Sequence, residues 1–128
     1  NGTRIRVGTQ NTMNDALAVT GFPYTRRENI EVIVERLKIM LMHVQCVRRL
    51  GSAALDLCHI ARGIFAVYWE TNLKPWDVAA GTLLVNEAGG RVTRFDGTPM
   101  ALDSYELLAT NGILHEESMR LLAPTLSR

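Results

Sequence analysis

The chain has 128 residues, of which 47% are hydrophobic and 21% charged, and its formal net charge is +1. This balance is typical of a globular domain, and a chain of this length can bury one sizeable hydrophobic core but not two. The near-zero charge excludes a strongly basic nucleic-acid-binding protein and an acidic disordered tail. No apolar run approaches the ~20 residues of a membrane-spanning helix. We therefore expect neither nucleic acid nor a membrane as a partner.

The first residues alternate between polar and apolar side chains, which predicts a half-buried strand over residues 1–8. The sequence opens on Asn1, without an initiator methionine, directly into this alternation. Because a domain rarely starts inside a strand, we expect residues 1–15 to be the tail end of a missing N-terminal domain. Residues 16–128 would then form a C-terminal domain.

The next two segments predict a strand and a long helix. Residues 16–20 form a short apolar run that Gly21 and Pro23 end, which is typical of a buried strand. From Ile30 to Val44, apolar residues recur at spacings of three and four, as on one face of a helix. The residues expected on the outer side are Glu31, Glu35, Arg36 and Lys38. Further apolar residues make this helix hydrophobic on more than one side, which suits either cover by two layers or contact with another subunit.

The remaining segments alternate between strand and helix patterns. Apolar, β-branched and aromatic runs predict strands at 47–50, 65–69, 91–95 and 107–110. Helical periodicity, with Pro at the start of one run and Gly after two of them, predicts helices at 53–61, 75–88 and 114–122. Asp96-Gly97 predicts a turn. This alternation is typical of the α/β class.

Most residues that could carry chemistry lack partners for it in the sequence. His43, His59 and His115 have no neighbours at metal-ligand spacing, so we predict surface or hydrogen-bonded core histidines. Cys46 and Cys58 fit no zinc or redox spacing, so we predict small buried thiols in a reducing compartment.

Two further features, a serine after a glycine and two arginine pairs, do not predict a catalytic activity. Ser52 follows a glycine, yet the G-x-S-x-G elbow of hydrolases is absent, so Ser52 is no obvious nucleophile. The arginine pairs at 26–27 and 48–49 are dispersed and matched by acids. Such pairs are more typical of a solvent-exposed face than of a patch that binds phosphate or RNA.

The stretch from Tyr68 to Gly81 is different, because it places two carboxylates around a strand end. Glu70 follows a predicted buried strand, and Asp77 lies in the first turn of a helix that begins at Pro75. Ligand sites of α/β proteins lie at such carboxyl ends of strands. Each residue also has a purely structural interpretation. The helix dipole stabilises an aspartate in a first turn, and Glu70 could be a solvated strand end.

The segment Trp76-Asp77-Val78-Ala79-Ala80-Gly81, followed by Glu87-Ala88-Gly89-Gly90, closely resembles the C-terminal signature of the inositol monophosphatase family. Gly21-Phe22-Pro23-Tyr24 and Gly51-Ser52-Ala53-Ala54-Leu55-Asp56 are similar to two further blocks of that family, in the right order. The resemblance runs from about residue 16 to about residue 124.

This resemblance implies the C-terminal half of an αβαβα sandwich, with a mixed, mostly parallel sheet flanked by helices. In this family, two or three Mg²⁺ ions held by carboxylates activate a water that attacks a phosphate monoester. By resemblance, Asp77 would be a metal ligand and Glu70 would bind substrate hydroxyls. Gly51, Ser52 and Ala53 would line the substrate pocket. The resemblance also implies a homodimer, inhibition by Li⁺ and an active site completed by an N-terminal domain.

The sequence departs from the family pattern at the other metal ligands. The family has a Glu-Glu pair and an Asp-Pro-x-Asp-Gly-Thr motif upstream, and neither occurs in that setting here. Asp96-Gly97-Thr98 matches the end of the second motif, but Thr93 and Arg94 replace its first Asp and Pro, so we predict a turn there. Glu116-Glu117 lies in the last predicted helix and is predicted as solvated charge. The chain thus carries one metal carboxylate, which does not hold a hydrated Mg²⁺ firmly.

The predicted function is hydrolysis of a phosphate monoester, with inositol monophosphate as the first candidate substrate. Histidinol phosphate, a sugar bisphosphate and a nucleotide 3′-phosphate remain alternatives, because they need the same chemistry in a different pocket. A truncated, non-catalytic module that uses the fold for protein contacts is an alternative of another class. The cytoplasm is the expected compartment, and a plastid is also compatible.

Overall fold

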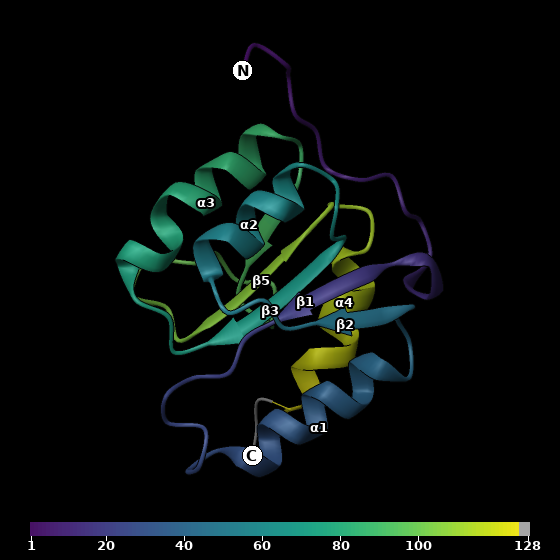
Figure 1. Ribbon diagram of the computed structural model, residues 1–128. Helices are drawn as coiled ribbons and strands as arrows, with labels where there is room; N and C mark the ends of the chain where they lie inside the picture. The colour runs from purple at the N-terminus through teal and green to yellow at the C-terminus, as the bar shows by residue number, and fades with distance from the viewer. Residues whose placement is uncertain (126–128) are drawn as a thin grey trace.

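A computed structural model describes residues 1–125, in which one five-stranded sheet has the order β2-β1-β3-β5-β4 (Figure 1). The strands are β1 (Leu17–Thr20), β2 (Cys46–Arg48), β3 (Val67–Thr71), β4 (Arg91–Thr93) and β5 (Glu106–Thr110). The helices are α1 (Ile30–Leu41), α2 (Ala53–Ala61), α3 (Pro75–Glu87) and α4 (His115–Leu122). Short 3-10 turns lie at Met13–Asp15 and Ala123–Thr125.

The sheet has a parallel half and an antiparallel half. Strand β1 pairs in parallel with both β2 and β3, whereas β5 pairs antiparallel with both β3 and β4. The α/β class and the mixed sheet are therefore confirmed. The expectation of a mostly parallel sheet is wrong, because two pairings are parallel and two are antiparallel. Because β1, β2 and β3 run in the same direction, their carboxyl ends meet at one edge of the sheet.

Helices cover both faces of the sheet, with α2 and α3 on one face and α1 and α4 on the other (Figure 1). The alternation along β3 divides the core accordingly. Val67 and Trp69 pack toward α1 and α4, whereas Tyr68 packs toward α2 and α3. Glu70 follows Tyr68 by two residues, so it projects from the same face of the sheet as Tyr68.

Helix α1 begins at Ile30 as expected, but its orientation differs from the prediction. Arg36, expected on the outer side, is only 7% exposed; its Nε donates to Thr125 Oγ1 at 2.8 Å, and its guanidinium lies 4.9 Å from the centre of the Phe95 ring. Ile30 and Val34 are about half exposed instead (49% and 52%). Within residues 1–125 the helix is therefore covered on one side only, which removes the two-layer interpretation.

The predicted strand over residues 1–8 is wrong within this structure. No strand is assigned there, and Val7 N–H donates to Ala88 O, directly after α3, at 3.1 Å. A strand needs a ladder of such bonds to a neighbour. The segment nevertheless contacts the domain, since Val7 packs on its core and Gln10 O accepts from Asn111 Nδ2 at 2.9 Å.

Several smaller predictions can be compared directly. His115 is fully buried between two threonine hydroxyls, at 2.7 Å from Thr93 Oγ1 and 2.8 Å from Thr110 Oγ1, as expected of a core histidine. Cys46 and Cys58 are free thiols but only half-buried, so the expectation of buried thiols is not met. Among the described helices, none combines the length and apolar character needed to cross a membrane.

A candidate active site at the carboxyl ends of the parallel strands

A cavity of about 320 Å³ opens where β1, β2 and β3 end and where α2 and α3 begin. Its wall comes from the segments that follow β1 and β2, from Glu70 of β3, and from the first turns of α2 and α3. The lining residues are Gly21, Phe22, Tyr24, Arg26, Arg49, Gly51, Ser52, Ala53, Ala54, Asp56, Glu70, Leu73, Trp76 and Asp77. We call this cavity the strand-end pocket.

All five residues singled out from the sequence line the strand-end pocket: Gly51, Ser52, Ala53, Glu70 and Asp77. They come from three segments that the sequence separates by up to 26 positions, and the fold brings them together. The amino ends of α2 and α3 both meet this pocket. Helix amino ends carry unpaired N–H groups and partial positive charge, so they favour an anionic ligand.

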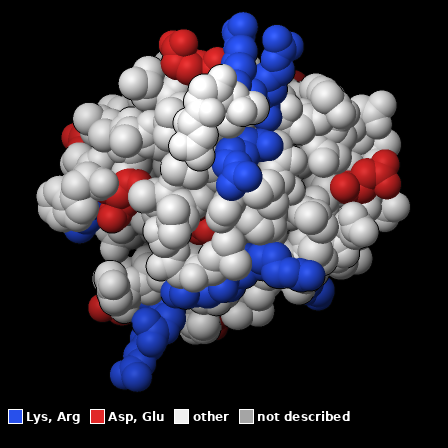
Figure 2. All heavy atoms as spheres, turned by 45° about the horizontal axis from the view of Figure 1, so that its top comes forward, with Lys and Arg blue, Asp and Glu red and all other residues white. Residues whose placement is uncertain are grey.

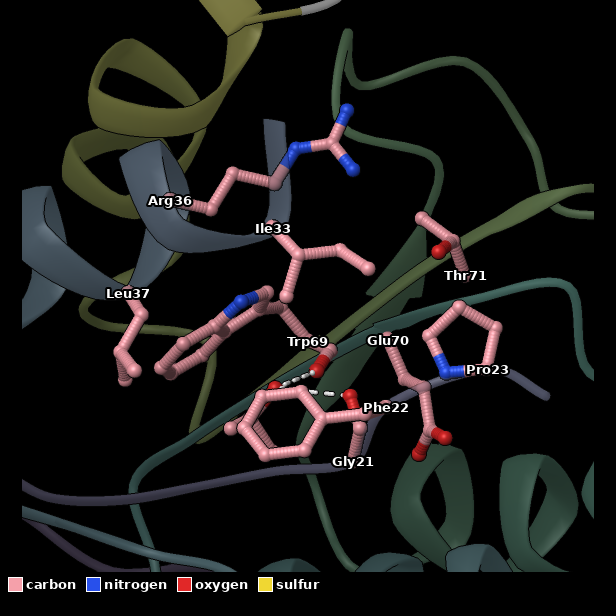
Figure 3. A pocket seen from close by; sticks show the side chains of 10 residues that line it. Gly21, Phe22, Pro23, Ile33, Arg36, Leu37, Trp69, Glu70 and Thr71 are labelled. Atoms are coloured by element: carbon pink, nitrogen blue, oxygen red, sulfur yellow. Dashed lines mark hydrogen bonds between the residues drawn. The ribbon is translucent and has the colours of Figure 1, made fainter. Parts of the chain in front are cut away.

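Glu70 lies inside β3 and not after it, because the strand extends to Thr71. Its Oε2 accepts a hydrogen bond from the hydroxyl of buried Tyr68 at 2.5 Å. Burial raises the pKa of Glu70 above its ordinary value, against the opposing effects of the Tyr68 hydrogen bond and of the Arg49 charge. Figure 3 shows the Glu70 carboxylate pointing away from the apolar side chains of Trp69 and Ile33.

The lack of a side chain at Gly21 leaves room for the Glu70 carboxylate. A β-carbon at residue 21 would overlap the carboxyl group of Glu70. The glycine directly after β1 therefore lets this carboxylate lie against the backbone of the neighbouring strand end. This contact accounts for the glycine that opens the Gly21-Phe22-Pro23-Tyr24 block.

Asp77 is half-buried at the start of α3, where its Oδ2 accepts from Lys74 N–H at 2.9 Å. Pro75 begins the helix and loses no hydrogen bond there, since it has no N–H to satisfy. Four residues after Asp77, Gly81 faces Leu57 of α2, and a β-carbon at residue 81 would overlap the Leu57 side chain. The last glycine of the Trp76–Gly81 motif thus allows α2 and α3 to pack closely.

The segment after β2 forms the opposite wall. Gly51 has a φ of +92°, and a β-carbon there would lie 2.5 Å from an Arg49 guanidinium nitrogen. Ser52 is the N-cap of α2, and its Oγ accepts from Leu55 N–H at 3.3 Å. Because it caps α2, the Ser52 hydroxyl has a structural role, consistent with the absence of a nucleophile motif. The Arg49 guanidinium lies 5.9 Å from the centre of the Phe22 ring.

Asp56 is the residue that sequence reasoning missed. It lines the pocket from the first turn of α2, is 1% exposed, and neither carboxylate oxygen has a hydrogen-bond partner among residues 1–125. Burial, with a smaller contribution from the Glu70 charge, raises its pKa to about 6. The Gly51–Asp56 block contained this residue, but an aspartate in a first helical turn is so common that position alone gave no signal.

The described residues do not make a complete metal site. Within residues 1–125, no group of three or more His, Cys, Asp or Glu side chains is placed to hold a metal ion. Asp77 is suited to give one ligand, because oxygen is the ligand that Mg²⁺ prefers and only one of its carboxylate oxygens is hydrogen-bonded. Thr93, Arg94 and the Asp96 turn lie on β4 and after it, outside the lining of the pocket.

Basic side chains do not form one continuous surface near this domain's N-terminal end. Figure 2 shows Lys and Arg in several separate groups on that face, with Asp and Glu at their margins. Arg26 and Arg49 line the strand-end pocket together with three carboxylates. The pocket is therefore mixed in charge, which suits a small polar ligand better than a long polyanion.

Comparison with known proteins agrees with this arrangement of elements and motifs. The sequence model of the "Inositol monophosphatase family" matches residues 1–127. The chain belongs to the inositol monophosphatase family. It is 44% identical over 124 residues to "Phosphatase IMPL1, chloroplastic" of Arabidopsis thaliana, covering 97% of this chain and 33% of that protein. It is 41% identical over 121 residues to "Inositol-1-monophosphatase" of Synechocystis, covering 94% and 42%.

Solved structures of the inositol monophosphatase family share the fold. The inositol monophosphatase from Anabaena (Nostoc) sp. PCC 7120 superposes with a TM-score of 0.90 at 44% identity, covering 96% of this chain and 50% of that one. The fold expected from the resemblance is thus confirmed. The chain spans a third to a half of the length of these relatives.

Proposed function

We propose that this chain forms the C-terminal part of the active site of a phosphatase that hydrolyses inositol monophosphate to inositol and phosphate. The observation that supports it is the strand-end pocket, which gathers Asp77, Glu70 and residues 51–53 at the amino ends of two helices. The family's named relatives supply the reaction, since they are called phosphatase and inositol-1-monophosphatase.

Each residue has a proposed role that fits its surroundings. Asp77 gives one ligand to Mg²⁺, whose other ligands come from a preceding domain outside this chain. Glu70, held by Tyr68 and Gly21, accepts hydrogen bonds from substrate hydroxyls. Gly51, Ser52 and Ala53 offer backbone N–H groups at the amino end of α2. Mg²⁺, when bound, provides positive charge for a phosphoryl group and for an attacking water.

The family also suggests an assembly, an inhibitor and a compartment for the proposed phosphatase. We propose a homodimer, for which the exposed apolar residues of α1 are available, and inhibition by Li⁺. The chloroplastic relative and the bacterial one make a plastid or the cytoplasm the proposed location. Histidinol phosphate, a sugar bisphosphate or a nucleotide 3′-phosphate would use the same chemistry, and comparing phosphate release over these substrates distinguishes them.

Replacing Asp77 by Asn in the full-length protein that contains this chain tests the proposed metal ligand. Asn keeps an oxygen for Lys74 N–H, so the start of α3 is preserved, while the charge for the metal is lost. We expect the rate of phosphate release from inositol 1-phosphate with Mg²⁺ to fall roughly 100-fold or more. Asp103→Asn, in an exposed turn, is the matched control and should retain activity. A near-unchanged rate in Asp77→Asn would contradict the assignment, and no release by the unaltered protein would favour the non-catalytic module.

A further inference from the structure

Asp56 is a buried carboxylate that the fold itself does not use. Its side chain is 1% exposed, and neither oxygen has a hydrogen-bond partner in the described part of the chain. The cap of α2 is already provided by Ser52 Oγ, and the Asp56 N–H donates to Ser52 O at 2.8 Å within the helix. A carboxylate kept for structure would be expected to cap the helix or pair with a cation, and Asp56 does neither.

The groups around Asp56 explain why its oxygens remain free. The hydroxyl of Tyr68, which faces the same side of the sheet, is already donated to Glu70. Arg49 is the neighbouring cation, but it lies beside the Phe22 ring and makes no ion pair with Asp56 among those found in residues 1–125. Glu70 brings a second negative charge near it. Asp56 is thus an acceptor without a donor on the wall of a pocket.

Resting on the function proposed above, we propose that Asp56 is a substrate-binding residue that accepts a hydrogen bond from a hydroxyl group of the bound phosphate ester. The strand-end pocket would then recognise the alcohol part of its substrate through two carboxylates, Asp56 and Glu70. Such a pocket selects a polyol, which offers two hydroxyl donors. A phosphate ester that has none would leave both carboxylates unpaired.

The charges of the pocket favour hydroxyl donors over an ammonium group. Arg26 and Arg49 already line it, and two helix amino ends add partial positive charge. A neutral hydroxyl therefore pairs with Asp56 without adding a further cation to this pocket.

The test compares Asp56→Asn and Asp56→Ala with Asp103→Asn in the full-length protein with Mg²⁺. Two constants are measured: the KM for inositol 1-phosphate, and the Ki of inorganic phosphate as a competitive inhibitor. Inorganic phosphate carries no alcohol part, so its Ki reports only on the phosphate subsite. We expect the KM to rise about tenfold or more in both Asp56 variants, as loss of a hydrogen bond to a charged group predicts, with the Ki changed less than twofold. Asp103→Asn should change neither constant.

Several outcomes would overturn this role for Asp56. An unchanged KM shows that no substrate hydroxyl meets Asp56, and a parallel rise of KM and Ki shows a general disturbance of the pocket. A preference of the unaltered protein for histidinol phosphate, lost in Asp56→Asn, would assign Asp56 to an ammonium group instead. If a variant unfolds, binding of inositol 1-phosphate to the other one, measured by calorimetry, decides between these outcomes. Absence of phosphate release by the unaltered protein contradicts the proposed function itself and is distinct from each of these results.

Discussion

A buried carboxylate without a partner makes the folded state sensitive to pH. The pKa of Asp56 is about 6 in the folded protein, against an ordinary value of 3.8. The folded state therefore holds the proton more tightly than the unfolded state between about pH 4 and pH 6. The stability that protonated Asp56 contributes is fully present below about pH 4 and is lost as the pH rises through about 6. A shift of this size corresponds to a free energy of unfolding on the order of 1–3 kcal/mol.

Asp56→Asn should therefore stabilise the protein at pH 7.5 by roughly 1–3 kcal/mol, because a neutral amide replaces a buried charge. At pH 4, where Asp56 itself is neutral, the two proteins should have similar stability. Urea denaturation at both pH values, followed by circular dichroism, measures the difference. Asp103→Asn should change stability little at either pH. Destabilisation by Asp56→Asn at pH 7.5 would mean that the carboxylate has a stabilising partner.

Asp56 also shows where sequence reasoning about single residues ends. Glu70 and Asp77 could be named because they flank a strand end and a proline-started helix, and the family signature surrounds them. Asp56 has the same local pattern as any aspartate in a first turn. Its burial depends on β3 and α3, which pack against α2 only once the chain is folded. Arg36 is a second case, since it contacts Thr125 and Phe95, which lie far from it in the sequence.

At the scale of elements, contact between α2 and α3 positions two of the pocket's carboxylates, Asp56 and Asp77. Gly81 allows this contact, because a β-carbon there would overlap Leu57. An alanine at an exposed helix position normally stabilises relative to glycine by about 0.5–1 kcal/mol. We expect the opposite sign for Gly81→Ala, a loss of roughly 1–3 kcal/mol from overpacking, together with lower activity as Asp77 shifts.

Thermal denaturation and phosphate release of Gly81→Ala measure both effects. Ala80→Ser enlarges the neighbouring exposed residue on the same helix and should leave both unchanged. A more stable Gly81→Ala protein would show that the helices have room for the methyl group, and that the glycine serves no packing purpose.

Elements whose signals are local could be predicted closely, and those that depend on partners could not. The helix over 53–61 was predicted with its observed bounds, because its apolar pattern and the glycine that follows it are local signals. The predicted strand over 1–8 failed because periodicity describes a side-chain pattern, whereas a strand also requires a neighbouring backbone. For the same reason, β3 extends past its apolar run to Thr71, where β5 supplies the hydrogen bonds.

At the scale of the whole molecule, the strand-end pocket is lined by β3, α2, α3 and the segments after β1 and β2, and Asp77 is its proposed metal ligand. Mg²⁺ binds through several oxygen ligands, and within residues 1–125 no group of three or more acidic, His or Cys side chains provides them. The relatives of this family are two to three times as long as the chain. The proposed phosphatase therefore requires carboxylates outside this chain.

We accordingly expect residues 1–128 expressed alone to release no more phosphate from inositol 1-phosphate than a blank, even with Mg²⁺ in millimolar excess. A colorimetric phosphate assay measures this, and circular dichroism on the same sample establishes that the chain is folded. The full-length protein, assayed in parallel, should be active. Asp77→Asn in the isolated chain should change nothing, because one ligand without the others binds the ion too weakly to matter. Robust turnover by residues 1–128, abolished by Asp77→Asn, would instead show that this chain can assemble a complete metal site. A second copy of the chain would then have to provide the missing carboxylates.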